Sequence, residues 1–391
     1  MNKYILNSEI QNFISANLTE DISKILFKGT DFENVSTQEI VEQIEAKKKC
    51  QNKLATWFNT KNIYYPNKLN IEQTSSELTA AYKASSISGN SIIDLTGGFG
   101  VDCISFSKKF KQVIHCEINN KLSQIVAHNL QQLNIKNTQI IPVDGISFLR
   151  KSTENYDWIY IDPSRRDDIK GKVFLLKDCL PNVPENLEVL FKHSDNILIK
   201  TSPILDLKSA ISELTFVKKI HIVAVNNEVK ELLFVLEKNY TDKIIIKTIN
   251  ISKNKNQFFE FDFNTTVDSN YSLPLNYLYE PNAAILKSGG FHEITTQFDI
   301  SKLQQHAHLY TSKELIDFPG RRFKIKQVIS FDKKQLKKLI PTGKANITIR
   351  NFPITVTQIR KKTKLKDGGN QYLFFTTNKN SKHIIIICEK I

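Results

Sequence analysis

The sequence predicts an α/β protein whose central sheet is mostly parallel, with a helical segment before it and a smaller α+β domain after it. From Asn90 onward, five short apolar runs alternate with segments of helical length: SIIDLTG, QVIHCEI, TQIIPVDG, YDWIYID and NILIKTS. Repeated strand–helix–strand units of this kind form parallel sheets with helices on both faces. The next two runs, KIHIVAV and ELLFVLE, are separated only by Asn226 to Lys230, so we expect them to form an antiparallel hairpin at the sheet edge.

Helical signals dominate the segment before this sheet. Residues 1–60 contain few helix breakers, and Ser36 and Glu39 have the spacing of a capping box that starts a helix. Apolar residues then follow at loosely helical spacing. A further helix is expected to begin at Thr74, Ser75 or Ser76, because hydroxyl side chains cap helix N-termini.

The end of the chain has a different element order. Beyond Pro319 the runs RRFKIKQVISF, KKQLKKLI, KANITIRNF, VTQIRKKTKL, YLFFTT and HIIIICEK predict the order strand, helix, strand, helix, strand, strand. This order predicts a small α+β sheet with helices on one face. Between the two sheets, residues 240–273 are polar and rich in asparagine, and residues 275–291 are expected to form a short helix that ends at Gly289 and Gly290.

Composition and cysteine usage narrow the class of protein. Hydrophobic residues make up 40% of the 391 positions and charged residues 24%, as in folded globular proteins. The sequence shows no signal peptide and no apolar run long enough to cross a membrane, so we expect a cytoplasmic protein without a membrane partner. Its five cysteines are scattered and form no C-x-x-C pair, so neither a disulfide framework nor a bound metal is expected.

The positive charge is confined to the end of the chain. The net charge is +14, and residues 301–391 alone hold 20 of the 54 Lys and Arg but only 5 of the 40 Asp and Glu. The first 300 residues are therefore close to neutral. A neutral body with a strongly basic terminal domain favours binding of a polyanion such as a nucleic acid, although a solvated lysine-rich surface would give the same count.

Polar and glycine residues follow three of the predicted strands at one edge of the sheet. Asp94 to Gly100 (DLTGGFG) follows the first strand, Glu117 ends the second, and Asp144 with Gly145 ends the third. Ligands bind at this edge in open α/β sheets. Alone, the glycine turn is equally typical of a nucleotide phosphate site or of a plain tight turn. Together with a carboxylate placed to accept hydrogen bonds from ribose hydroxyls, it indicates a nucleoside-containing cofactor.

A fourth signal follows the fourth strand, where the sequence reads Tyr160-Ile-Asp162-Pro-Ser-Arg165-Arg166. With these residues, residues 90–240 resemble the class I S-adenosylmethionine-dependent methyltransferases. In that family, an Asp/Asn-Pro-Pro-aromatic motif at this place orients an amino group toward the methyl carbon. Here Ser164 and Arg165 stand where the motif has the second proline and the aromatic residue. The motif therefore does not indicate which nitrogen would be methylated. Arg165 and Arg166 could hold a base or a phosphate, or could be ordinary surface arginines.

The resemblance implies a site for S-adenosylmethionine and a set of catalytic residues. It also makes carbon-5 methylation of a base a poor fit, because no cysteine follows the next strand at residues 199–203. The implied cofactor-binding residues are Asp94, Thr96, Gly97, Gly98, Gly100, Glu117, Asp144 and Gly145, and the implied catalytic residues are Asp162, Pro163, Ser164 and Arg165.

Over its whole length the chain resembles bacterial class I methyltransferases with a THUMP-like C-terminal region. The segments that carry this likeness include DLTGGFGVD, IDPSRR, YEPNAAILKSGGF, HLYTS, DFPGRRF and RNFP. The resemblance implies four regions: helical residues 1–85, a methyltransferase domain at 86–245 that resembles a Rossmann fold, a connecting THUMP-like segment at 246–318, and a basic C-terminal α+β domain, THUMP-like or ferredoxin-like, at 319–391.

THUMP-type domains bind RNA, so the resemblance implies an RNA substrate. Phe318 and Phe323 could stack on bases, although core packing is the ordinary role of such residues. We expect the chain to methylate a base in structured RNA such as tRNA or rRNA. Two alternatives stay open: a non-catalytic RNA-binding protein on the same fold, and a methyltransferase for a protein or small molecule. The expected phosphate contacts are Arg321, Arg322, Lys333, Lys334, Lys337, Lys338, Arg360, Lys361 and Lys362.

Overall fold

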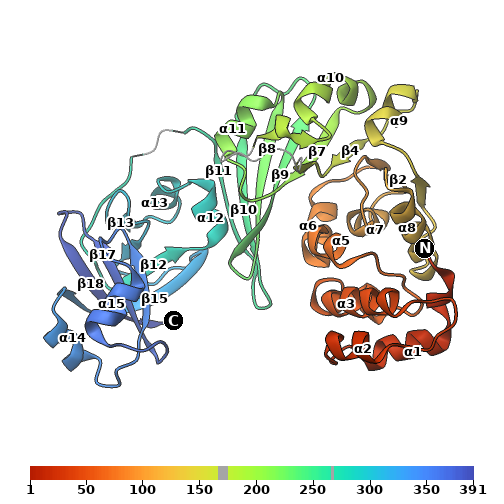
Figure 1. Cartoon of the computed structure of the whole chain (residues 1–391). Coiled ribbons are helices and arrows are strands. Elements are labelled where there is room, and N and C mark those ends of the chain that lie inside the picture. Colours follow the sequence, from red (N-terminus) through yellow and green to blue (C-terminus); the bar gives the residue numbers. More distant parts are fainter. Residues whose placement is uncertain (166–174, 266–267) are drawn as a thin grey trace. The chain divides into compact units, whose positions relative to one another are not determined.

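The computed structural model describes residues 1–165, 175–265 and 268–391 (Figure 1). The chain forms two compact units, which are described separately below. The first comprises Met1–Lys219 with Glu231–Asp242, and the second comprises Ile220–Lys230 with Lys243–Ile391. In the described part of the chain, no helix is both long and apolar enough to cross a membrane.

The first unit begins with the predicted helical segment. Ser36 and Glu39 form the expected capping box, with the Glu39 backbone N–H donating to Ser36 Oγ at 3.2 Å. Of the three candidate caps near residue 75, Ser76 is the one that caps a helix, and its Oγ accepts from the Thr79 N–H at 3.2 Å. The helices are η1 (Lys3–Leu6), α1 (Ser8–Ala16), α2 (Ile22–Lys28), α3 (Thr37–Lys53), α4 (Ala55–Asn59), α5 (Lys68–Gln73) and α6 (Glu77–Ser86).

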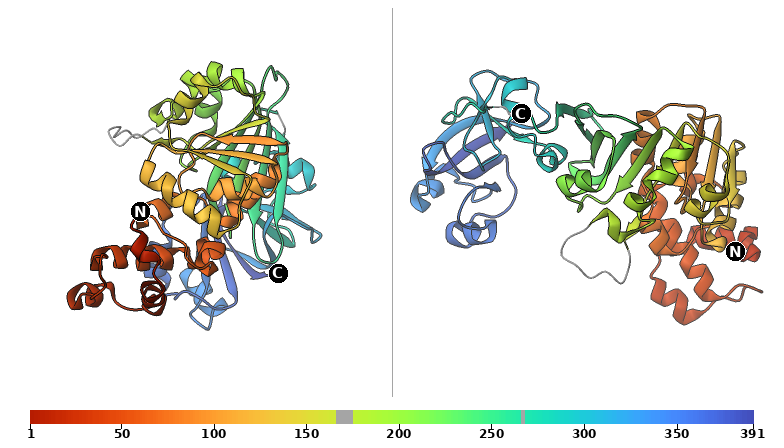
Figure 2. Two further views of the ribbon diagram at one scale, coloured as in Figure 1. Left: turned by 90° about the vertical axis from the view of Figure 1, so that its right-hand side faces the viewer. Right: turned by 90° about the horizontal axis from the view of Figure 1, so that it is seen from above.

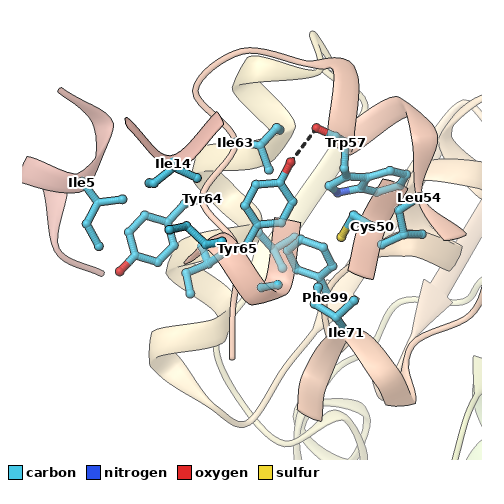
Figure 3. Packing of buried hydrophobic residues seen from close by; sticks show 14 of the residues in the cluster. Ile5, Ile14, Cys50, Leu54, Trp57, Ile63, Tyr64, Tyr65, Ile71 and Phe99 are labelled. Carbon is cyan, nitrogen blue, oxygen red and sulfur yellow. Dashed lines mark hydrogen bonds between the residues drawn. The ribbon is translucent and has the colours of Figure 1, made fainter. Parts of the chain in front are cut away.

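These helices share a core with the glycine-rich turn of the sheet (Figure 3). The rings of Trp57 and Phe99 lie 6.2 Å apart between centroids, and Phe99 belongs to the turn. The Tyr65 hydroxyl donates to the Trp57 carbonyl at 2.9 Å, the bond drawn in Figure 3. The N-terminal helices therefore hold the glycine turn from one side, so they form part of the scaffold of the site.

The predicted parallel sheet is confirmed in the first unit. The strand order is β9-β7-β4-β1-β2-β3, and β7, β4, β1, β2 and β3 pair in parallel. Helices lie on both faces, with α6 and α7 on one and α9 and α10 on the other (Figure 2). The strands are β1 (Ser91–Asp94), β2 (Gln112–Cys116), β3 (Thr138–Ile141), β4 (Trp158–Ile161) and β7 (Asn196–Thr201). The helices between them are α7 (Val101–Ser107), α8 (Asn120–Gln132), α9 (Gly145–Lys151), α10 (Val183–His193) and α11 (Leu207–Glu213).

The predicted antiparallel hairpin is present, but its expected place at the sheet edge is wrong, because the strand β10 (Ile245–Ile251) adjoins β8 on the far side from β9. β8 (Val217–Val225) and β9 (Glu228–Glu237) are joined by Asn226 and Asn227, whose φ angles are +50° and +66°. Two consecutive left-handed residues are the signature of a type I′ hairpin turn, and asparagine tolerates this conformation well. β9 then runs antiparallel to β7. Short elements complete the unit: β5 (Ser164–Arg165), η2 (Leu176–Asp178) and β6 (Cys179–Leu180).

The second unit contains an antiparallel pair that the sequence analysis did not predict. β10 (Ile245–Ile251) and β11 (Gln257–Asp262) pair with each other inside the region expected only to be polar. The alternation of IIIKTIN and QFFEFD was the available signal. The asparagines that obscured it include Asn264, which adopts φ +61° just after β11.

A seven-stranded sheet of order β13-β14-β12-β15-β18-β17-β16 forms the rest of the second unit. The expected helix at residues 275–291 is wrong in its first half: a strand, β12 (Tyr277–Pro281), precedes the helix α12 (Ala283–Ser288), because β12 pairs on both sides with neighbouring strands. The helix ends at Gly289 (φ +77°), as predicted. The other elements are α13 (Glu293–Gln297), β13 (Ser301–Lys302), β14 (Tyr310–Ser312), β15 (Gly320–Ser330), α14 (Lys333–Leu339), β16 (Asn346–Arg350), α15 (Val356–Thr363), β17 (Gln371–Thr377) and β18 (His383–Lys390).

Both faces of this sheet are buried, which explains the unbroken apolar run in β18. Ile385 and Ile387 pack with Leu336 of α14 and Ile359 of α15, so both helices cover one face as predicted. Neighbouring residues of β18 point to the other face and pack with Phe323. Phe323 is fully buried and Phe318 is 3% exposed, so both phenylalanines have the core role.

Candidate functional site

The glycine turn leaves β1 at Asp94 and enters α7 after Gly100. Gly98 and Gly100 have φ angles of +54° and +79°, a conformation that favours glycine. At Gly97 a Cβ atom would lie 2.3 Å from Nε2 of the buried His115, so close packing also requires a glycine there. At Gly98 the nearest atom to such a Cβ would be the Thr96 carbonyl oxygen at 3.8 Å, which leaves this backbone open to a ligand.

Glu117 lies against this turn. Its Oε2 accepts a hydrogen bond from the Gly98 N–H at 2.9 Å, and its Oε1 accepts from the Asn119 N–H at 2.7 Å. The side chain is therefore oriented beside the open backbone of Gly98. The structure thus brings together the ends of β1 and β2, the first two of the predicted strand-end signals.

The third strand-end signal, Asp144 with Gly145, lies near the glycine turn because the two backbone segments pack closely. Asp144 caps α9, its Oδ1 accepting from the Ser147 N–H at 2.7 Å. A Cβ atom on Gly145 would lie 2.5 Å from the carbonyl oxygen of Leu95, the residue that follows β1. Gly145 is therefore required because α9 begins directly against the turn, and this contact places Asp144 near it.

Two exposed apolar side chains next to these carboxylates were missed by the sequence analysis. Ile118 is 73% exposed and follows Glu117; Val143 is 40% exposed and precedes Asp144. An apolar residue adjoining an acid at a strand end was the signal that could have identified them. Both offer exposed apolar surface beside the two carboxylates, a combination of the kind that lines small-molecule sites.

The side chain of Asp94 is buried and stabilises the glycine turn instead of facing solvent. It is 1% exposed, and its Oδ1 accepts hydrogen bonds from the N–H and the hydroxyl of Thr96 at 2.9 and 3.3 Å. Burial raises the pKa of the Asp94 carboxyl to about 8, and its hydrogen bond with the Thr96 backbone opposes the rise. Asp94 and Thr96, both predicted as cofactor ligands, therefore shape the turn from inside.

Thr96 also connects the turn to the candidate catalytic residues. The Asp162 N–H donates to Thr96 Oγ1 at 2.7 Å. Asp162 forms an ion pair with Lys200 of β7, with 2.6 Å between Oδ2 and Nζ. Burial raises the pKa of Asp162, and the Lys200 ammonium partly offsets that rise. Lys200 was also missed, although the polar ending of an otherwise apolar strand, NILIKT, pointed to it.

The remaining motif residues are only partly described. Pro163 is buried and Ser164 is exposed, and the backbone of Ser164 and Arg165 pairs with Cys179 and Leu180. The side chain of Arg165 and all of Arg166 lie outside the described residues. The expectation that these arginines contact substrate stays a prediction.

A buried charged cluster lies behind the catalytic motif. Lys83 is fully buried, and its ammonium lies 2.7 Å from Oε2 of Glu231 and 3.2 Å from Oδ1 of Asp102. The Tyr160 hydroxyl and the Ser75 hydroxyl donate to Oδ2 of Asp102 at 2.9 and 2.8 Å. Three well-separated segments of the chain thus converge here, which fixes α6, α7 and β9 around β4, the strand that Asp162 follows.

The predicted RNA contacts divide into two groups. The arginines are held by the fold: Arg321 Nε donates to the buried carboxylate of Glu280 at 2.6 Å, Arg360 donates to the Leu365 carbonyl at 3.1 Å, and Arg322 lies 3.7 Å from Asp317. The lysines of α14 and α15 are exposed, and the two helices pack against each other. These exposed lysines are Lys333, Lys334, Lys337, Lys338, Lys361 and Lys362.

The fold and the arrangement at the strand ends define an α/β domain of the class I methyltransferase type. Family models match three segments: residues 66–206 to conserved hypothetical protein 95, residues 277–319 to a ferredoxin-like domain, and residues 320–390 to a THUMP domain-like model. No curated protein matches the sequence.

One of the solved structures extends this likeness over nearly the full chain. A "putative methyltransferase" from Porphyromonas gingivalis W83 shares 31% identity, with 99% of this chain and 98% of that one covered and a TM-score of 0.89. An rRNA methylase from Streptococcus thermophilus shares 16% identity over 42% of this chain and 98% of its own, with a TM-score of 0.31. The chain belongs to the family of class I methyltransferases with a THUMP-like C-terminal domain.

Proposed function

We propose that the chain is an S-adenosylmethionine-dependent methyltransferase that modifies a base in structured RNA. The observation that carries the proposal is the hydrogen bond between Glu117 and Gly98 beside the exposed side chains of Ile118 and Val143. A carboxylate, an open glycine backbone and two apolar surfaces at adjacent strand ends have the chemistry to bind a nucleoside: ribose hydroxyls, a charged tail and a planar base.

The residues present fit such a cofactor. Glu117 would accept hydrogen bonds from the ribose hydroxyls, and Asp144 would accept one from the exocyclic amine of the base. Ile118 and Val143 would contact the faces of the ring. The bound cofactor would supply an electrophilic methyl group.

Asp162 is the best-placed group for the methyl acceptor. Its backbone is tied to Thr96 of the glycine turn, so it lies close to the proposed cofactor site. A carboxylate there can accept a hydrogen bond from an acceptor N–H and so orient the nitrogen lone pair. Carbon-5 methylation fits poorly, because that reaction needs a thiol nucleophile and all five cysteines are buried.

The exposed lysines of α14 and α15 support RNA as the substrate. Six ammonium groups on two adjacent helices can neutralise phosphates along a nucleic acid backbone. We infer a cytoplasmic site of action from the scattered, buried cysteines, which fit a reducing compartment.

A comparison of modified nucleosides tests this function. RNA from cells with and without the gene would be digested to nucleosides and compared by mass spectrometry. We expect one methylated nucleoside to disappear in the deletion strain and to return with the wild-type gene, but not with Asp162→Ala. RNA affinity with no change in any nucleoside would favour the non-catalytic alternative. Methyl transfer that persists after deletion of residues 301–391 would favour a protein or small-molecule substrate.

A further inference from the structure

Lys200 forms an unusual ion pair at the end of the sheet. Its side chain is 15% exposed and that of its partner Asp162 is 28% exposed, so both charges are largely removed from water. The strands β4 and β7 pair in parallel with Ile161 opposite Ile199, which places Lys200 beside the motif that follows β4. Pairs of this kind add little net stability because desolvation cancels much of the attraction, so this one calls for another explanation.

The charge of Lys200 acts on the ionisation of Asp162. Burial raises the pKa of Asp162, and the ammonium of Lys200 is the largest influence that lowers it. Other charged groups also act on these two residues. They are Asp94 of β1, Lys83 of α6, Asp102 of α7 and Glu231 of β9. Burial and the nearby carboxylate of Asp102 both raise the pKa of Asp162, so without Lys200 its carboxyl would hold its proton to a higher pH.

The contacts of Asp162 also decide which oxygen can meet a substrate. Oδ2 accepts from Lys200 at 2.6 Å, and the backbone N–H is bound to Thr96. Among the described residues, leaving aside the side chain of Arg165, no hydrogen bond reaches Oδ1 of Asp162. The side chain is therefore fixed through one oxygen while the other can accept a hydrogen bond.

We propose that Lys200 is a positioning residue for methyl transfer, which keeps Asp162 ionised and directs Oδ1 toward an N–H group of the acceptor base. This inference rests on the proposed function. In the step, the lone pair of the acceptor nitrogen forms the new N–C bond. The C–S bond of the sulfonium breaks, and its electron pair stays on sulfur. The proton released from nitrogen passes to Oδ1 of Asp162 and then to water.

Activity measurements test this role through the pH profile. The probe is RNA from cells that lack the gene, with S-adenosylmethionine labelled in its methyl group. For Lys200→Met we expect kcat at pH 7 to fall at least about tenfold, the acid limb of the profile to move to higher pH, and KM for the cofactor to stay within about twofold. Lys200→Arg should restore most of kcat. Lys218→Met, which removes the ion pair between Lys218 of β8 and Glu237 at the end of β9, should leave the profile unchanged.

A second measurement needs neither cofactor nor substrate. Thermal unfolding of wild type, Asp162→Asn, Lys200→Met and the double variant gives the coupling between the two side chains. We expect the double variant to lose less stability than the sum of the single losses, and Lys200→Met to gain stability below pH 6 relative to pH 8. Additive losses, or a Lys200→Met enzyme with an unshifted profile, would overturn the role of Lys200. A wild-type protein that binds no cofactor and transfers no methyl group would instead overturn the proposed function.

Discussion

The ammonium of Lys83 lies 2.7 Å from Oε2 of Glu231, and neither side chain reaches solvent. The two residues are 148 positions apart, so this contact joins α6, before the sheet, to β9, which runs antiparallel to β7. Replacing Lys83 by Met would leave Glu231 and Asp102 without their shared cation. We expect a loss of about 3–5 kcal/mol in the free energy of unfolding, measured by urea titration.

Removing both charges together provides the control. Lys83→Met combined with Glu231→Leu should lose less stability than Lys83→Met alone, because no uncompensated Glu231 carboxylate is left in the core. If the stability loss of the double variant equalled the sum of the two single losses, the pair would not act as a coupled unit.

The pKa of Asp94 predicts a pH dependence of stability. Its folded pKa is about 8, against an ordinary value of 3.8, so between these values the folded protein holds a proton that the unfolded chain has released. Stability from this group is therefore greatest at low pH and is lost as the pH rises toward 8, by at most about 1.4 kcal/mol per pH unit. Asp94→Asn should remove that contribution in urea titrations between pH 5 and pH 8. An unchanged slope would show that Asp94 is ionised in the folded state.

Gly97 can be tested through its close approach to His115. An alanine at residue 97 would place a methyl group 2.3 Å from Nε2 of a buried imidazole, so we expect Gly97→Ala to cost about 1–3 kcal/mol of stability. The same substitution should cost less in a His115→Ala background, where the ring is absent. Equal costs in the two backgrounds would mean that backbone strain, and not the contact with the ring, requires glycine.

The elements predicted correctly from the sequence are those that depend on the pattern of neighbouring residues. Alternating runs and turn residues identified the parallel strands and the hairpin at Asn226 and Asn227. The strand-end rule then brought Glu117 and Asp144 to one edge, because parallel strands place their carboxyl ends together. Local pattern failed at β10 and β12: asparagines disguised the alternation at β10, and β12 depends on pairing with distant strands.

The residues of the buried charged cluster were not predicted either, and they share one physical cause. Lys83, Asp102 and Glu231 acquire their roles only when three separated segments meet, and a buried lysine looks like any surface lysine in the sequence. The sequence also did not indicate that the Arg360 guanidinium donates to the Leu365 carbonyl within its own domain; its contact with RNA stays a prediction.

The lysines of α14 and α15 predict a salt-dependent affinity for RNA. Reversing four of them to Glu (Lys337, Lys338, Lys361 and Lys362) should weaken binding to bulk tRNA strongly at low salt. It should also lower the slope of log affinity against log salt by about 3–4, as expected for the loss of about four phosphate contacts. Fluorescence anisotropy would measure both. Reversal of Lys108, Lys109 and Lys111, which are exposed in the first unit, is the control and should change the slope little.

Calorimetric titration with S-adenosylmethionine tests the central claim most directly. We expect one molecule to bind per chain of the wild-type protein, and Asp144→Ala to weaken binding by about tenfold or more, since one hydrogen bond to a charged group contributes about 1.5–3 kcal/mol. The thermal unfolding midpoint of Asp144→Ala would check that the variant is folded. A folded wild-type protein that binds neither S-adenosylmethionine nor S-adenosylhomocysteine would contradict the account.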